Sequence, residues 1–211
     1  MTDIVIESCC TSPKEAFAAQ SRGASRIELC VNLAVGGTTP PRELVRQVVH
    51  ACSIPVNVLI RPRGVALSAQ DFVYGETDIE EMVREIEMCR HEGAAGIVVG
   101  ALTGDGKIDI EAMERLMEAA DGLPVTFHRA FDVCREEPPE ALEKIIGLHC
   151  ARLLTSGMAP TAWEGRELIS RLVARSAGRI IVMPGSGIKP HNLEAVREET
   201  GAHEFHGTAL P

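Results

Sequence analysis

The sequence predicts a (β/α)8 barrel of the TIM type, formed by a single domain that covers residues 1–211. Short apolar runs alternate with helix-compatible segments along the whole chain, which is the pattern of an α/β protein. The connections between these runs are long enough for parallel crossovers. Because there are eight runs, a closed barrel is favoured over an open sheet. A doubly wound sheet stays the alternative, although the chain has no GxGxxG fingerprint of a dinucleotide fold.

Each strand is predicted from a short run that is rich in Val, Ile, Leu or Phe and is bounded by turn residues. We expect strands at residues 4–7, 26–30, 56–60, 96–100, 125–128, 152–155, 180–183 and 204–206.

The helices are predicted from capping residues at one end and glycine at the other. Ser12 precedes Pro13, Thr77 precedes an apolar stripe that includes Met82, and Asp109 precedes Ile110. We expect helices at residues 13–21, 42–51, 78–92, 110–120, 139–147, 161–175 and 190–200. The sequence ends at Pro211, so we expect the barrel to lack its final helix.

The composition and the start of the sequence indicate which partners and which cellular compartment to expect. The net charge of -9 argues against a general nucleic-acid or anionic-membrane surface. No apolar stretch approaches the roughly 20 residues that cross a bilayer. The start of the chain, Met1–Ile6, has no basic signal region and enters a strand-like run directly. We therefore expect a cytosolic protein, with the nucleus also open for a eukaryotic source.

Polar residues gather where the predicted strands end, which is the functional face of a barrel. Glu7, Glu28 and His128 are candidate catalytic acids or bases, because their side chains transfer protons. Arginine side chains hold anions, and a Gly-rich turn can aim N–H groups at phosphate. The candidate residues for binding a small anionic ligand are Arg61, Arg63, Arg129, Asp132, Thr155, Ser156, Gly185 and Gly187.

A second chemistry is suggested by two cysteines. The chain has seven cysteines without a CxxC pair, which indicates neither a disulfide framework nor a zinc ribbon. Cys9 and Cys30 are expected at the ends of the first two strands, which are neighbours in a barrel. Thiolates are preferred ligands of Cu(I), so this pair is a candidate copper site. Two unrelated buried thiols remain the alternative.

A series of short motifs runs in order through nearly the whole chain. They are Gly23-Ala24, Arg26-Ile27-Glu28-Leu29-Cys30, Gly36-Gly37-Thr38-Thr39-Pro40, Ile60-Arg61-Pro62-Arg63-Gly64, Asp71-Phe72-x-Tyr74, Asp105-Gly106-x-Ile108-Asp109, Thr126-Phe127-His128-Arg129-Ala130-Phe131-Asp132, Leu154-Thr155-Ser156-Gly157 and Glu204-Phe205-His206. In these motifs the chain resembles the CutC family of copper homeostasis proteins. The resemblance implies a TIM barrel, homo-oligomers (dimers or tetramers) and Cu(I) binding by the cysteines that match Cys9 and Cys30.

Two segments depart from the family's pattern. Residues 65–70 separate Gly64 from Asp71, where the family reads Arg-Pro-Arg-Gly-Gly-Asp-Phe, and the sequence ends soon after His206. An alternatively spliced or a wrongly assembled transcript would explain both departures, and sequencing of the message would test this hypothesis.

Two functions follow from these observations. The first is a cytosolic protein of copper homeostasis that binds Cu(I) through Cys9 and Cys30. The second is a barrel lyase or isomerase that acts on a small anionic or phosphorylated metabolite. The sequence leaves open whether the protein is an enzyme.

Overall fold

Eight parallel strands alternate with helices in the computed structural model, which describes residues 4–64 and 68–208. The strands are β1 (Val5–Cys10), β2 (Arg26–Leu29), β3 (Val56–Leu59), β4 (Gly96–Val99), β5 (Val125–Phe127), β6 (Arg152–Thr155), β7 (Ile181–Pro184) and β8 (Glu204–Gly207). Residues 65–67, in the segment that departs from the family's pattern, and residues 209–211 lie outside the described part.

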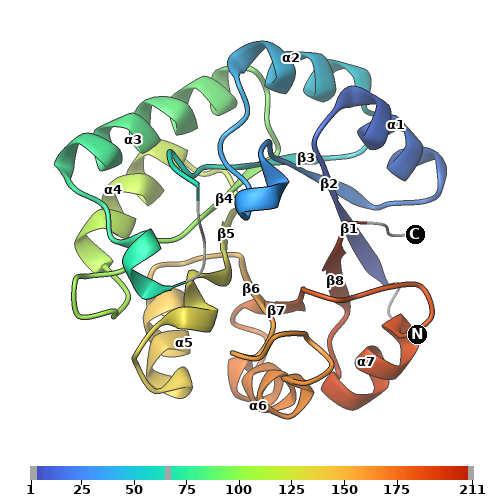
Figure 1. Cartoon of the computed structure of the whole chain (residues 1–211), viewed down its shortest axis with the longest axis vertical. Coiled ribbons are helices and arrows are strands. Elements are labelled where there is room, and N and C mark those ends of the chain that lie inside the picture. The colour runs from blue at the N-terminus through green and yellow to red at the C-terminus, as the bar shows by residue number, and fades with distance from the viewer. Residues whose placement is uncertain (1–3, 65–67, 209–211) are drawn as a thin grey trace.

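The strands form a nearly closed barrel, as the sequence predicted. Their hydrogen-bonded order is β7-β6-β5-β4-β3-β2-β1-β8, so the last strand pairs with the first. β7 and β8 lie side by side at the ends of this order, and no ladder joins them among the described residues. Figure 1 shows the helices as an outer layer around the strands.

Seven α-helices and three short 3-10 helices connect the strands within residues 4–64 and 68–208. The α-helices are α1 (Pro13–Ser21), α2 (Arg42–Ala51), α3 (Glu76–His91), α4 (Ile110–Ala120), α5 (Pro138–Gly147), α6 (Arg166–Ser176) and α7 (Leu193–Thr200). The 3-10 helices are η1 (Leu33–Val35), η2 (Ala69–Phe72) and η3 (Arg129–Val133), and each follows the end of a strand.

Side-chain caps explain where two helices begin. The Ser12 hydroxyl accepts a hydrogen bond from Glu15 N at the start of α1, and the Asp109 carboxylate accepts one from Ala112 N at the start of α4. Both caps are predicted correctly, because a short polar side chain satisfies backbone N–H groups that have no partner in the first turn.

Four predicted boundaries differ from the structure by two residues or more. α3 begins at Glu76, before the predicted cap Thr77, because the Asp78 carboxylate accepts a hydrogen bond from Gly75 N. α6 starts at Arg166 and α7 at Leu193, since side-chain-bonded turns occupy residues 161–165 and 189–192. β1 extends to Cys10, so Cys9 lies inside the strand rather than beyond it.

Alternate residues of each strand face opposite sides of the barrel wall, as the two-residue period of a strand requires. On β2, Ile27 and Leu29 belong to the apolar core that includes buried residues of the outer helices. Arg26 and Glu28 are also buried, but their contacts are polar. The Arg26 guanidinium binds the carboxylates of Glu7 on β1 and Glu204 on β8, and the Glu28 carboxylate lies near the His206 imidazole on β8. The outer layer of the core is therefore apolar, whereas the barrel interior contains charged groups.

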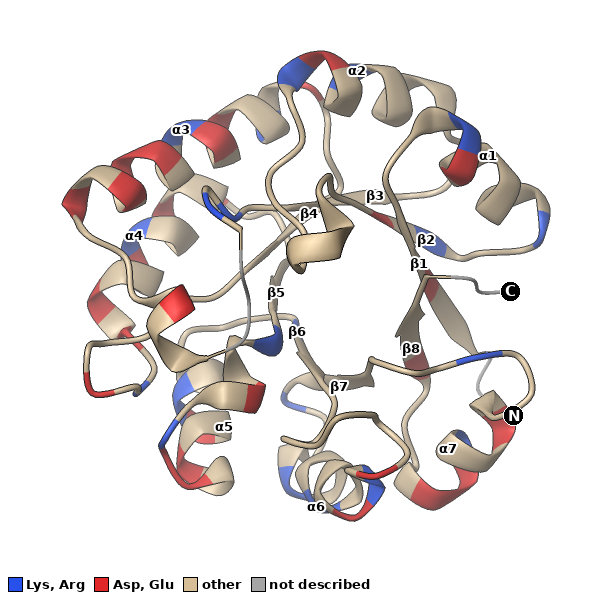
Figure 2. Cartoon of the chain, viewed as in Figure 1, with Lys and Arg blue, Asp and Glu red and all other residues tan. Residues whose placement is uncertain are grey.

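Charged residues of both signs are distributed along the outer helices in Figure 2. The described part of the chain has no helix that is long and apolar enough to cross a membrane.

Candidate functional site

A cavity of about 400 Å³ lies at the carboxyl ends of the strands. Its wall contains residues from, or just after, all eight strands, so the barrel brings together segments that are far apart in the sequence. The residues that line it include Cys9, Glu28, Cys30, Arg61, Phe72, His128, Arg129, Asp132, Ser186, Gly187, Lys189 and His206. This is the end of a barrel where ligands are expected to bind.

The two cysteines predicted to bind copper meet in this cavity. The Sγ atoms of Cys9 and Cys30 are 3.6 Å apart, and both residues are buried. Their sulfur atoms pack beside Leu59 and Val98 in a small apolar cluster inside the barrel. The contact with Cys30, together with burial and the nearby Glu28 carboxylate, raises the pKa of the Cys9 thiol.

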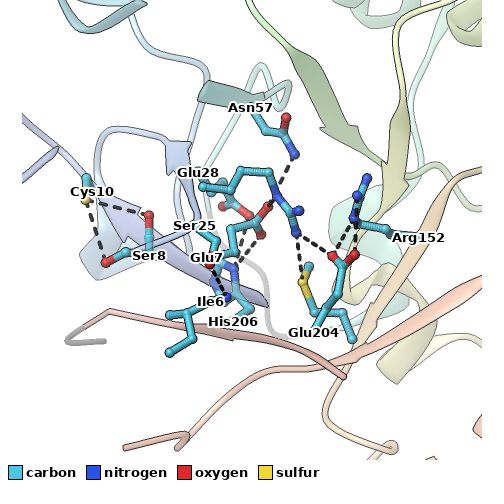
Figure 3. A network of polar contacts seen from close by, with 12 residues as sticks. Ile6, Glu7, Ser8, Cys10, Ser25, Glu28, Asn57, Arg152, Glu204 and His206 are labelled. Carbon is cyan, nitrogen blue, oxygen red and sulfur yellow. Dashed lines mark hydrogen bonds and ion pairs between the residues drawn. The ribbon is translucent and has the colours of Figure 1, made fainter. Parts of the chain in front are cut away.

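A chain of buried charges joins β1, β2, β6 and β8 in the barrel interior (Figure 3). The Arg26 guanidinium bridges the carboxylates of Glu7 (2.5 Å) and Glu204 (2.8 Å), and the Arg152 guanidinium binds Glu204 from the other side (2.7 Å). The His206 ring completes the chain, with Nδ1 lying 2.9 Å from Glu7 Oε1. Opposite charges therefore alternate across the interior, which offsets the cost of burying each of them.

Glu7 is held as a carboxylate. Burial acts to raise its pKa, but the hydrogen bond with His206 and the charge of Arg26 outweigh burial and lower the pKa to about 2. Its Oε2 also accepts a hydrogen bond from the Asn57 amide (3.2 Å). With both oxygens engaged, Glu7 fixes the positions of the side chains around it.

Glu28 lies between the charged chain and the cavity. Its Oε2 lies 3.5 Å from His206 Nδ1 and has no hydrogen-bond partner among the described residues. Burial raises the pKa of Glu28 to about 7, with the Glu7 charge adding to the rise and the His206 charge opposing it. Burial would lower the pKa of His206, but the carboxylates of Glu28 and Glu7 raise it to about 9.

His128 follows β5 and lines the cavity with its ring buried. Burial, reinforced by the positive charge of Arg61, lowers the pKa of His128 to about 3, so the ring is neutral at pH 7. The backbone N–H of Ala130 donates to Nδ1 (3.3 Å), which assigns the proton of the neutral ring to Nε2. His128 is thus suited to donate a hydrogen bond rather than to exchange protons near neutral pH.

Arg61 and Arg63 follow the same strand but lie in different places. The Arg61 guanidinium lines the cavity, donates from Nη1 to the carbonyls of Val35 and Gly37, and lies over the Phe72 ring. The Arg63 side chain is half exposed and forms an ion pair with Asp78 at the start of α3 (3.0 Å). Among the described residues, Arg61 lines the cavity and Arg63 does not.

The Asp132 carboxylate organises one side of the rim. It accepts hydrogen bonds from Arg129 Nε, from the Thr155 hydroxyl and from the backbone and side chain of Ser156. These contacts join η3 to the end of β6 and the residue after it, and they engage four of the residues predicted to bind a ligand.

The Gly-rich turn after β7 forms the neighbouring part of the rim, because β7 pairs with β6. Ser186 and Gly187 line the cavity, both with positive φ, whereas the N–H of Gly185 donates to Thr155 O. Lys189, two residues further on, also lines the cavity. The turn therefore contributes a basic side chain in addition to its backbone.

Several residues of the site were not among the sequence-based candidates. They are Arg26, Asn57, Phe72, Arg152, Lys189, Glu204 and His206. A two-residue period was the available signal for three of them. Arg26 precedes Glu28 and Cys30 at alternate positions of one strand, and Glu204 precedes His206 in the same way.

Comparison with known proteins identifies the family. The model of the CutC family matches residues 4–210. The chain belongs to the CutC family. A CutC family protein of Parabacteroides distasonis is 46% identical over 206 residues, covering 97% of this chain and 82% of the relative. The human copper homeostasis protein cutC homolog is also 46% identical, covering 97% of this chain and 73% of that protein.

Solved structures agree with this assignment. The crystal structure of CutC from Streptococcus agalactiae superposes with a TM-score of 0.91 at 34% identity and covers 99% of this chain and 100% of that one. An aldolase, QR15, superposes with a TM-score of 0.69 at 16% identity, covering 98% of this chain and 90% of the aldolase chain. At that identity the aldolase shares the barrel fold alone.

Proposed function

We propose that this CutC family member binds Cu(I) through the thiolates of Cys9 and Cys30. The observation that carries the proposal is the 3.6 Å distance between the two Sγ atoms in the lining of the cavity. A metal–thiolate bond is about 2.3 Å long for zinc, so sulfur atoms at this distance are within reach of a single ion. Sulfur ligands in an apolar cluster suit the soft Cu(I) ion.

A neighbouring set of donor atoms gives this proposal a competitor. Ligand atoms of Cys9, Glu28 and His206 all lie within 4.8 Å of one another. A thiolate, a carboxylate and an imidazole favour a divalent ion such as Zn²⁺ over Cu(I). The two ligand sets share Cys9 and differ in the remaining residues, so substitutions can separate them.

Anaerobic titration with Cu(I) and with Zn²⁺ tests the proposal. We expect Cys9→Ser and Cys30→Ser to abolish Cu(I) binding, whereas Glu28→Gln retains it. Cys52→Ser is the matched control, since Cys52 is a half-buried cysteine away from the cavity. Loss of metal in Glu28→Gln with full binding in Cys30→Ser would assign the ion to the competing set and contradict the proposal.

We also infer a cytosolic protein that forms a homo-oligomer, either a dimer or a tetramer. The seven cysteines are free in the structure, and thiols are kept reduced in the cytosol. Membership of the CutC family supports the oligomer. Cell fractionation and sedimentation velocity test these two inferences, and a monomer at micromolar concentration would contradict the second.

The second candidate function is a lyase or isomerase that acts on a small anionic metabolite. It is favoured by the convergence of Glu28, Arg61 and His128 on one cavity, because a proton-transfer enzyme needs a carboxylate, a cation and a hydrogen-bond donor around its substrate. A metabolite-library screen by thermal shift tests it, since a ligand that binds only the folded state raises the melting temperature. The absence of any stabilising metabolite would contradict it.

A further inference from the structure

We propose that the cavity binds a small oxyanion, either a carboxylate or a phosphate, between the Nε2–H group of His128 and the guanidinium of Arg61. The inference deepens the second candidate function and rests on it. It does not depend on copper binding, because the cysteines are not part of the proposed anion subsite.

The first support is a hydrogen-bond donor that has no acceptor. His128 is buried, and its Nδ1 is occupied by the N–H of Ala130. Its Nε2 has no hydrogen-bond partner in the described part of the chain, although the ring belongs to the cavity lining. A buried polar group without a partner is unfavourable, so an acceptor supplied by a ligand would satisfy it.

The second support is the rigid placement of Arg61 next to this donor. The Arg61 guanidinium lies 5.3 Å from the centre of the Phe72 ring, and the His128 ring lies 5.0 Å from the same ring in an edge-on arrangement. Phe72 thus contacts both the cation and the donor. The carbonyls of Val35 and Gly37, which accept from Nη1, also hold the guanidinium in place.

The third support is the charge of the lining. Four basic side chains, Arg61, Arg129, Lys189 and His206, line the cavity together with two carboxylates, Glu28 and Asp132. The Asp132 carboxylate is bonded to Arg129 on the rim, and Glu28 lies next to His206. An anion that enters the cavity therefore meets more positive than negative groups.

Two substitutions at one position test the assignment. Gln can place an amide N–H near the position of the histidine Nε2, whereas Asn can accept the Ala130 N–H in place of Nδ1 but is too short to replace Nε2. In calorimetric titrations we expect the wild-type protein to bind inorganic phosphate, pyruvate or both. Acetone, titrated at the same sodium chloride concentration as an uncharged control, is expected not to bind. His128→Gln retains binding, and His128→Asn weakens it about tenfold or more, as expected for a lost hydrogen bond to an anion.

The outcomes separate this inference from the two proposed functions. Equal anion affinity in His128→Asn and the wild type overturns the assignment of His128, and so does the absence of binding by both anions. Phosphate without pyruvate binding, or the reverse, identifies which oxyanion the subsite accepts. The Cys9→Ser, Cys30→Ser double variant is expected to retain anion binding. An anionic hit in the metabolite screen that binds His128→Asn as tightly as the wild type would support the enzyme candidate and overturn this inference.

Discussion

Glu7 shows how a carboxylate can be buried completely and still remain charged. Its two oxygens contact Arg26, Asn57 and His206, and these contacts outweigh the effect of burial on its pKa. Removing one member of a buried ion pair is costly because the remaining charge has lost its compensation. Glu7 therefore contributes to stability through the groups that it neutralises.

Glu7→Gln is predicted to destabilise the protein by about 3–5 kcal/mol, the range for breaking a buried ion pair. The amide keeps the shape of the side chain but leaves Arg26 with less negative charge beside it. Urea denaturation followed by circular dichroism measures the change. Glu43→Gln is the control, because Glu43 forms an exposed pair with Arg46 on α2, and we expect no measurable change there. Equal midpoints for Glu7→Gln and the wild type would contradict the prediction.

His128 predicts a pH dependence of stability with a definite sign. Its pKa is about 3 in the folded protein and 6.5 in the unfolded chain, so between these values the unfolded state binds the extra proton. The stability that His128 contributes is complete above pH 6.5 and is lost as the pH falls from 6.5 towards 3. The loss amounts to about 1.4 kcal/mol for each pH unit in this window.

Comparison of the wild type with His128→Asn at pH 7.0 and 5.5 isolates this effect. The difference in unfolding free energy between the two proteins should change by about 1.4 kcal/mol in favour of the variant at the lower pH. His50→Gln, which removes an exposed histidine of α2, is the control for general acid effects. A difference that stays constant across the two pH values would show that His128 is not held neutral by the fold.

At the scale of elements, the caps and periodicity of the chain predicted most helices, but the start of α6 depends on contacts that the sequence does not reveal. Gly165 precedes α6, and a Cβ atom added there would lie 2.0 Å from Ser156 O. The turn at residues 161–165 therefore packs directly against the segment after β6. A helix pattern that begins at Thr161 is locally reasonable, and this tertiary contact overrides it.

Gly165→Ala is predicted to destabilise the protein by about 3 kcal/mol, because the added methyl group meets backbone atoms that cannot move aside alone. The matched control is Gly147→Ala at the end of α5, where nothing lies within 4 Å of an added Cβ. That substitution should be neutral or stabilising by up to about 1 kcal/mol, since Ala favours a helix over Gly. Thermal and urea denaturation of both variants measure the contrast, and similar midpoints for the two would refute it.

For the whole molecule, the sequence predicted the barrel and the cavity end because these depend on the order of strands and helices. It did not predict how the interior charges pair. Glu204 and Arg152 are 52 residues apart, and their contact follows from the register and closure of eight strands together. Arg63 is a second residue whose charge partner the sequence did not predict. Its position after a strand suggested a ligand contact, whereas the structure pairs it with Asp78.

No backbone ladder joins β7 to β8 in the described residues. Side-chain contacts therefore contribute more to holding these two strands together than they do between paired strands. Glu204 on β8 reaches across to Arg152 on β6, and Arg26 on β2 contacts both Glu204 and the Met183 sulfur on β7. These contacts join strands on both sides of the boundary inside the barrel. Local opening should therefore begin at this boundary rather than between paired strands.

Arg152→Met is predicted to raise the hydrogen-exchange rates of β8 amides about tenfold, equivalent to about 1.4 kcal/mol of local opening, while β3 amides change much less. β3 is paired on both sides by β2 and β4, so its exchange requires a larger opening. Arg175→Met on α6, which removes an exposed contact with Glu143, is the control for loss of an arginine. Uniform acceleration of all strands in Arg152→Met would mean that the barrel opens as one unit and that this side-chain link does not secure β8 in particular.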